Sequence, residues 1–305
     1  MTDLLLLQAI GGAQFGVLLF LVAAGLTLVF GIMDFINLAH GVLYMIGAYL
    51  MASFAAFFDN YWLGLLLTLP AVLILGLALE FLVFRKLYDR PHLDQVLATM
   101  ALMMMITEAV RMIWGAAPLN VDMPDALSAS IPLVGPMRFP VYRLAIIAAG
   151  VSVAIGLWLV IARTRIGMLL RAGASRRAMV SALGVDISKL FMIVFAFGAM
   201  LAGFAGAIVS PVLSVGPGMG DSILILTFVV IVIGGVGSIK GAFVAAILVG
   251  IIDTVGRIFG PILLREIMDP GAAASAGRTL APMLIYILMA AVLCWRPSGL
   301  FGRRA

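Results

Sequence analysis

Charge is the scarcest property of this chain. Charged residues make up 11% of its 305 residues and hydrophobic residues 64%, against about 25% and about 45–50% in an ordinary soluble domain. No charged residue lies between Asp3 and Asp34, or between Lys189 and Asp221. Each gap is longer than the roughly 20 apolar residues with which a helix crosses a bilayer core about 30 Å thick. This pattern excludes a water-soluble fold and predicts a polytopic membrane protein.

The residues of metal and nucleophile chemistry are nearly absent as well. Cys294 is the single cysteine, which excludes an intrachain disulfide and a thiolate metal site, and there is no GxxxxGK[S/T] phosphate loop. Proton-driven carriers usually string several acids or histidines along their path. Here Glu80 and Asp253 are isolated, and Glu108 has Arg111 at i+3 as a local ion partner. We therefore expect no enzyme, no cofactor or metal site, and no binding of nucleotide or nucleic acid by this chain.

The charge-poor segments are the candidates for membrane-spanning helices. Several are short or interrupted by glycine, so we expect eight to ten helices in one all-α transmembrane domain over residues 1–305. The nine candidate segments are Leu4–Phe30, Gly41–Phe58, Tyr61–Phe84, Leu93–Trp114, Val141–Ala162, Leu190–Val212, Ser222–Ile233, Gly241–Phe259 and Thr279–Trp295.

Lysine and arginine are unevenly distributed among the connections. Residues 163–189, called here the basic loop, hold six basic residues against the single acid Asp186. Basic residues also gather after the third segment, at 85–90, and in the tail, at 296–304, whereas the segments 115–140 and 261–277 are balanced in charge. Because cytoplasmic loops carry the excess of Lys and Arg, we expect the C-terminus in the cytoplasm. With nine crossings, the N-terminus lies outside.

The first polar interruption of the apolar pattern contains Asp34, Asn37 and His40, followed by Gly41 and Tyr44. Unpaired polar groups in hydrocarbon cost several kcal/mol, so this stretch must be buried in protein, line water or lie at an interface. Two interpretations remain open. One is a broken helix beside a translocation path, as in many transporters; the other is an interfacial turn in which Asn37 or Asp34 caps the helix that begins near Gly41.

The second interruption is rich in glycine and comprises Gly234, Gly235, Gly237, Ser238 and Gly241. Glycine at this density unwinds a helix or lets two helices approach closely. No predicted strand precedes the segment, which argues against a phosphate loop. It weakly echoes the first interruption, since both end in a residue that can be basic followed by glycine, and an internal repeat is one explanation.

The basic loop predicts a short amphipathic helix between Gly167 and Lys189, with Gly184 as the glycine that ends it. Its apolar positions are Met168, Leu170, Met179, Val180 and Leu183, and its polar positions are Arg171, Arg176 and Arg177. The loop is longer than a simple connection needs to be. It is either a topology anchor at the lipid headgroups or a docking helix for a cytoplasmic partner.

Four blocks of sequence carry a resemblance to a known family. They are INLAHGxxYMIGAY at residues 36–49, Thr164-Arg165-x-Gly167 with Arg171-Ala172 and Leu183-Gly184-Val185, IGGVGSIxGA at residues 233–242, and RPSGLFG at residues 296–302. In these blocks the chain resembles the inner-membrane permeases of ABC importers for branched-chain amino acids, of the LivH type. Arg176 departs from the family pattern, in which Asp or Asn is frequent, and residues 85–87 lack the usual RPL.

The resemblance implies an all-helical, type II-like importer subunit in the bacterial inner membrane. It implies three kinds of partner: a homologous second permease, two cytoplasmic ATPase subunits that hydrolyse ATP, and a periplasmic substrate-binding protein. The implied ATPase-coupling residues are Arg165, Gly167, Arg171, Ala172, Leu183 and Gly184. The candidates for the translocation path are Asn37, His40, Gly41, Tyr44, Gly234, Gly235, Gly237, Ser238 and Gly241.

The solute is less constrained than the class of protein. Relatives in the same superfamily carry urea, short amides, aromatic acids or sugars, and a stand-alone carrier or channel is the alternative from a different class. Because the membrane charges are few and scattered, we expect a mostly apolar path without a tight charged site. High-affinity selection then belongs to the binding protein, with Asn37, His40, Tyr44 and Ser238 as weak polar contacts.

Overall fold

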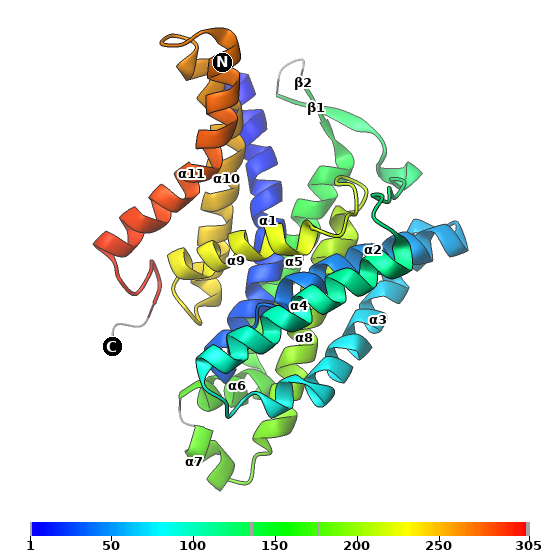
Figure 1. The fold of residues 1–305 in the computed structure, drawn as a ribbon, viewed down its shortest axis with the longest axis vertical. Helices are drawn as coiled ribbons and strands as arrows, with labels where there is room; N and C mark the ends of the chain where they lie inside the picture. Colours follow the sequence, from blue (N-terminus) through cyan, green and yellow to red (C-terminus); the bar gives the residue numbers. More distant parts are fainter. Residues whose placement is uncertain (1, 135–136, 176, 303–305) are drawn as a thin grey trace. The chain divides into compact units, whose positions relative to one another are not determined.

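The computed structural model describes residues 2–134, 137–175 and 177–302, and these residues are almost entirely helical (Figure 1). Its elements are α1 (Thr2–Met33), α2 (His40–Phe58), α3 (Tyr61–Leu82), η1 (Phe84–Lys86), α4 (His92–Trp114), η2 (Asp125–Leu127), β1 (Ser130–Val134), β2 (Met137–Pro140), α5 (Val141–Arg163), α6 (Arg165–Ser175), α7 (Arg177–Ala182), α8 (Ile187–Val209), α9 (Met219–Gly234), α10 (Ile239–Leu264) and α11 (Pro270–Trp295).

Eight helices within the described ranges are long and apolar enough to cross a membrane: α1 to α5, α8, α10 and α11. The predicted all-α polytopic fold is confirmed, and the number lies within the expected eight to ten. The remaining predicted segment, Ser222–Ile233, corresponds to α9, a shorter apolar helix of 16 residues. At 1.5 Å per residue it is about 24 Å long, less than the thickness of the hydrocarbon core.

A short β-hairpin lies in the connection between α4 and α5, where we predicted no strands. β1 and β2 pair antiparallel, with Ser130 opposite Pro140 and Ile131 opposite Phe139. The hairpin leads directly into α5, because Val141 begins that helix immediately after the last strand residue.

The chain divides into two units, each with its own packing. Unit 1 comprises Met1–Phe20, Pro124–Val151 and Phe228–Ala305, and unit 2 comprises Leu21–Met123 and Ser152–Thr227. The helices α1, α5 and α9 contribute residues to both.

Unit 2 is built around α2, α3 and α8, which pack on one another. The closest approach lies between α2 and α8, where a Cβ built on Gly47 would lie 2.7 Å from the carbonyl carbon of Gly203. On α3, a Cβ built on Gly76 would lie 2.6 Å from the Cβ of Ala199. Small residues at these positions let the helix backbones touch, which is how helices associate where lipid supplies no hydrophobic drive.

Unit 1 repeats this kind of contact with other helices. A Cβ built on Gly12 of α1 would lie 2.8 Å from the carbonyl oxygen of Gly250 on α10, and one on Gly16 would lie 2.7 Å from the Cα of Ile247. Because the later residue of α1, Gly16, contacts the earlier part of α10, the two segments run antiparallel. α11 also packs on α10, with Gly256 against Leu284.

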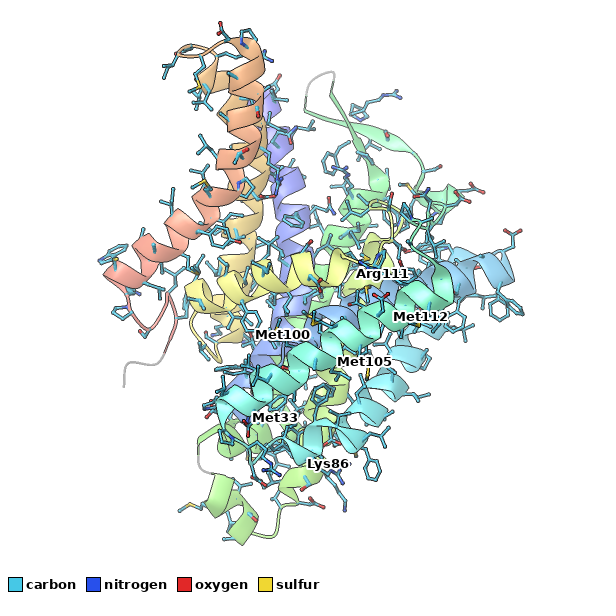
Figure 2. The ribbon with its side chains drawn as sticks, in the orientation of Figure 1. Met33, Lys86, Met100, Met105, Arg111 and Met112 are labelled. Carbon is cyan, nitrogen blue, oxygen red and sulfur yellow. The ribbon has the colours of Figure 1, made fainter. Side chains whose placement is uncertain are left out.

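Four of the five methionines of α4 are exposed, and Met103 is half-buried. Met100, Met105 and Met112 stand along the helix in Figure 2, and all three side chains are exposed, as is that of Met104. The side chains therefore do not fill the interior of unit 2. An exposed apolar face on a membrane-spanning helix meets lipid or another membrane subunit.

Candidate functional site

The first interruption is an unwound segment between α1 and α2. Residues 34–39 are not helical, and Asp34 has a positive φ of 50°. Side chains of α4 accept from two of its backbone donors: the Ile36 N–H donates to Gln95 Oε1 at 3.3 Å, and the Leu38 N–H to Thr99 Oγ1 at 3.2 Å. Broken backbone in a membrane protein persists when protein groups complete its hydrogen bonds. Here α4 does so.

Sequence reasoning missed Gln95 and Thr99. Both side chains are buried, and the Gln95 amide nitrogen also donates to the carbonyls of Leu87 and Arg90 at 3.3 and 3.0 Å. The sequence pattern could have indicated them, since two polar residues at i and i+4 share one face of an otherwise apolar helix. That face supports the break.

The predicted caps of α2 were wrong. The helix begins at His40 after Ala39, and no side chain caps it. Asn37 is instead fully buried, and neither its amide oxygen nor its amide nitrogen has a hydrogen-bond partner among the residues that the structure describes. The left-handed conformation of Asp34 turns the chain away from α1 and leaves that side chain exposed. Burying a polar amide without a partner is costly.

His40 is held in a tight space beside α8 and is not a free ligand. Its Nε2 lies 3.2 Å from the carbonyl oxygen of Val22 in α1. A Cβ built on Gly25 would lie 3.0 Å from the imidazole and 2.6 Å from the carbonyl oxygen of Gly198. Tyr44, one turn along α2, is buried as well. Unit 2 thus brings Asn37, His40 and Tyr44 together on one short stretch of chain.

The second interruption is a turn between α9 and α10, and it lies in unit 1. Gly235 and Gly237 have φ of 98° and 78°, values that favour glycine. Ser238 caps α10 as its hydroxyl oxygen accepts from the Gly241 N–H at 3.1 Å. A Cβ built on Gly234 would lie 2.7 Å from the Ala242 nitrogen, so the two helix ends are in contact.

The C-terminal segment packs on this turn. The Leu300 and Phe301 N–H groups donate to the carbonyl oxygens of Ile233 and Gly234 at 2.9 and 3.0 Å. A Cβ built on Gly235 would lie 2.9 Å from the carbonyl oxygen of Ser298. The glycine-rich block at residues 233–242 and the C-terminal block at residues 296–302 therefore pack against each other.

The basic loop contains two helices, α6 and α7, where one was predicted. Arg176 lies between them and outside the described residues. The predicted end at Gly184 is supported, since this residue has a φ of 84°. Leu170 and Val180 are buried, whereas Met168, Met179 and Leu183 are exposed. The amphipathic pattern is therefore distributed over two short helices.

Local contacts fasten the basic loop at both ends. At the start, the Gly167 N–H donates to Thr164 Oγ1 at 3.1 Å, and the Arg171 guanidinium donates to the carbonyl oxygen of Ile161 in α5. At the other end, Asp186 caps α8 by accepting from the Lys189 N–H at 3.1 Å, and this hydrogen bond lowers the pKa of Asp186. The loop is thus connected to α5 and α8.

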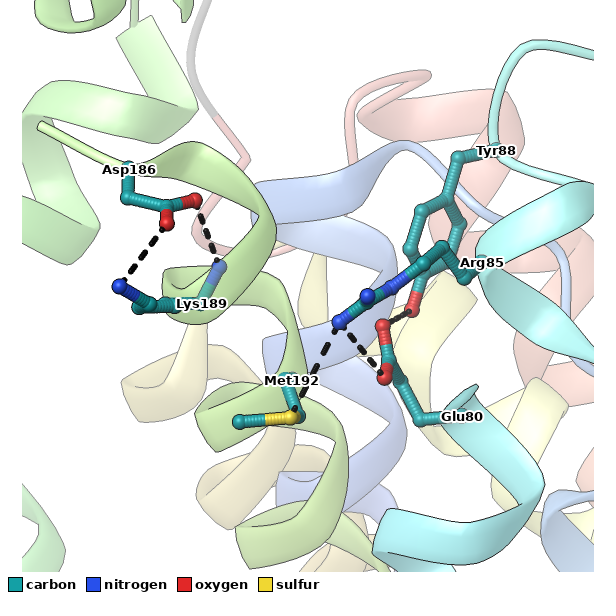
Figure 3. A network of polar contacts seen from close by, with 6 residues as sticks. All are labelled: Glu80, Arg85, Tyr88, Asp186, Lys189 and Met192. Carbon is teal, nitrogen blue, oxygen red and sulfur yellow. Dashed lines mark hydrogen bonds and ion pairs between the residues drawn. The ribbon is translucent and has the colours of Figure 1, made fainter. Parts of the chain in front are cut away.

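A polar cluster lies at the same end of unit 2 as the basic loop (Figure 3). The Tyr88 hydroxyl donates to Glu80 Oε1 at 3.1 Å, and Arg85 Nη2 lies 3.6 Å from Glu80 Oε2. The same Nη2 also donates to the sulfur of Met192 in α8, at 4.0 Å. Glu80 is fully buried, so these groups compensate a carboxylate that would otherwise be unpaired.

Known proteins match the chain along most of its length. The family described as branched-chain amino acid transport system, permease component, matches residues 8–293. The high-affinity branched-chain amino acid transport system permease protein BraD of Pseudomonas aeruginosa is 27% identical, over 97% of this chain and 95% of that protein. The corresponding protein LivH of Escherichia coli K12 is 26% identical over the same shares.

A more distant relative is the probable branched-chain amino acid transport permease protein LivH of Methanocaldococcus jannaschii, 23% identical over 80% of this chain and 78% of that protein. No solved structure matches the chain significantly. The family match covers the helix break, the basic loop and the glycine turn alike. With eight helices long and apolar enough to cross a membrane among its described residues, the chain is a multi-pass inner-membrane protein, and it belongs to the family of branched-chain amino acid transport system permease components.

Proposed function

We propose that this chain is a membrane subunit of an ATP-driven ABC importer and forms half of the translocation path for branched-chain or related amino acids. Two cytoplasmic ATPase subunits hydrolyse the ATP, a homologous second permease completes the path, and a periplasmic binding protein delivers the solute. The family match supports the transport role. The printed functions of the relatives, at 27% and 26% identity, support the class of solute.

One observation carries the dependence on ATPase partners: the exposed apolar side chains of the basic loop. Leu183 is 79% exposed and Met168 56% exposed, on a segment outside the membrane-spanning helices. Large apolar side chains left exposed outside the membrane favour a protein interface. A topology anchor needs the arginines alone, whereas a docking surface also uses these apolar side chains.

The contacts at the ends of the basic loop suit it to transmit force. Its first helix is bonded to the end of α5 through Arg171, and its exit is capped by Asp186 at the start of α8. Motion of a bound ATPase would therefore pass into two membrane helices. Asn37, His40, Gly41 and Tyr44 in unit 2, and the glycine turn in unit 1, are the segments that we assign to the path or to the seam with the second permease.

Co-purification tests the assignment. An affinity-tagged chain solubilised gently from its own membranes is expected to bring down two ATPase subunits and a second permease. Leu183→Asp places a charge on the docking face and is expected to lose the ATPases but keep normal membrane levels, whereas the matched Leu183→Met retains them. Equal recovery of ATPase subunits with both variants contradicts docking through the loop.

A further inference from the structure

An ion pair that the sequence pattern did not reveal lies within α10. Arg257 Nε donates to Asp253 Oδ2 at 2.8 Å, and its Nη2 lies 2.8 Å from Oδ1. The Asp253 side chain is 7% exposed and that of Arg257 51% exposed. A charged pair with one buried and one open member thus stands on a membrane-spanning helix.

The pair lies inside the apolar part of the span. α10 has 26 residues, about 39 Å of helix, and Asp253 is about 21 Å from its start and about 17 Å from its end. A hydrocarbon core about 30 Å thick therefore includes it. Ionisable residues at this depth are costly and usually functional.

Helix packing in unit 1 does not require these charges. Gly12 and Gly16 of α1 contact the backbone of α10 around Gly250 and Ala246. Asp253 and Arg257 continue the same stripe of α10 beyond that contact. Following the antiparallel register by one turn, from Gly12 to Gln8, brings an amide-bearing residue of α1 to the level of the pair.

The two side chains meet at two points, since Arg257 Nε and Nη2 lie 2.8 Å from Asp253 Oδ2 and Oδ1. The half-exposed guanidinium still has donors to spare, because it carries five.

We infer that Asp253 and Arg257 form a weak transit site for the charged groups of an α-amino acid. The inference rests on the proposed function. The α-ammonium of the solute pairs with Asp253 while its α-carboxylate pairs with Arg257, so one ion pair opens and two form. Neither member of the pair is then left unpaired in hydrocarbon. The existing ion pair competes with the solute, which keeps the site weak and leaves high-affinity selection to the binding protein.

A purely structural ion pair makes a different prediction. Removing one member of a buried pair strands the other charge, but replacing both by neutral groups is often tolerated. The double variant Asp253→Asn/Arg257→Gln therefore separates the two roles. Its control is Glu108→Gln/Arg111→Gln, which neutralises the exposed pair on α4, where the two side chains are 3.4 Å apart.

The experiment measures ATP-dependent leucine uptake per assembled complex in proteoliposomes that contain all subunits and the binding protein. We expect the double Asp253/Arg257 variant to assemble and hydrolyse ATP but to lose at least tenfold in uptake, and the control to stay within twofold of wild type. Uptake by the double variant within twofold of wild type overturns the transit site. Absence of ATP-dependent leucine uptake by the wild-type complex overturns the proposed function instead.

Arg257→Lys covers the case in which the double variant does not assemble. This change keeps the charge next to Asp253 but removes the planar fork that binds a carboxylate at two points. We expect the maximal uptake rate to fall at least threefold at normal complex levels. An unchanged rate contradicts the site.

Discussion

The phenol of Tyr88 donates a hydrogen bond of 3.1 Å to the carboxylate of Glu80, and its ring stands between two phenylalanines. The ring centroids are 5.5 Å apart for Phe35, in the helix break, and 5.4 Å apart for Phe191, in α8. Edge-to-face contacts of this kind add to the burial of each ring. Tyr88 thus joins the break, the end of α3 and the start of α8 near the basic loop.

Tyr88→Phe keeps the ring packing and removes the hydroxyl. The buried Glu80 oxygen then loses a donor, which is expected to destabilise the folded state by about 1–3 kcal/mol. Thermal unfolding in detergent measures the effect, with Tyr286→Phe as the control, since that tyrosine is exposed. Equal melting temperatures for the two variants contradict the structural role of this hydrogen bond.

The pH dependence of the same contact follows from the pKa of Tyr88. Burial raises this pKa, and the nearby Glu80 charge raises it further. Because the pKa of Tyr88 is higher in the folded state, its contribution to the free energy of unfolding is fully present below the pKa of the unfolded state, about 10. This contribution is lost as the pH rises through the pKa of the folded state. The difference in stability between wild type and Tyr88→Phe is therefore expected to be constant from about pH 6 to about pH 9.

The contact between Gly47 and Gly203 predicts a large effect of adding a side chain. Gly47→Leu forces α2 away from α8, and overpacking of this kind costs about 3 kcal/mol or more. Gly156 on α5 is the matched control, because a Cβ built there meets nothing within 4 Å. We expect Gly47→Leu to lower the folded fraction in detergent and Gly156→Leu to preserve it. Comparable loss in both would show that helix propensity, not packing, governs the result.

Gly235 is expected to be intolerant of any side chain. Its φ of 98° strains other residues, and a Cβ would lie 2.9 Å from the Ser298 carbonyl oxygen. Gly235→Leu should reduce solute uptake per unit of protein far more than Leu66→Ala, since Leu66 is 64% exposed on α3. Equal uptake by the two variants refutes a role for the glycine turn in transport.

Uncoupling is the expected result of changing the end of the basic loop. Gly184→Pro is incompatible with the φ of 84° found there, because proline fixes φ near −65°. Gly184→Pro and Leu183→Asp, each made separately, should reduce uptake at least tenfold while membrane insertion persists. ATP hydrolysis should persist in the Gly184→Pro complex, which keeps Leu183 on its docking face, whereas Leu183→Asp loses the ATPases themselves. Normal uptake by both variants would leave the loop with the role of a topology anchor alone.

Hydrophobic patterning predicted the spans well where charges bound them. The predicted segment Val141–Ala162 became α5, Val141–Arg163, because Arg163 marks its end. The boundaries were less accurate around residues 261–277: α10 continues through Pro261 to Leu264, and α11 begins at Pro270, nine residues before the predicted Thr279. Proline is tolerated in membrane helices and favoured at a helix start, so both helices extend into a segment that we predicted to be a loop.

The candidate site was predictable as sequence blocks but not as contacts. Asn37, His40 and Tyr44 were found because polar residues stand out in an apolar run, yet the α4 side chains that support the break come from 59 and 61 residues away. The pairing of Asp253 with Arg257 was within reach, since i and i+4 share a helix face. It was missed because Arg257 lies near the predicted end of its span.

Leucine uptake by purified components in proteoliposomes tests the central claim most directly. The chain is compared alone and together with its second permease, two ATPase subunits and the binding protein, with ATP present or absent. We predict uptake for the full assembly with ATP and no uptake for the other combinations. Leucine transport by the chain alone, independent of ATP, would contradict its role as a subunit of an ATP-driven importer.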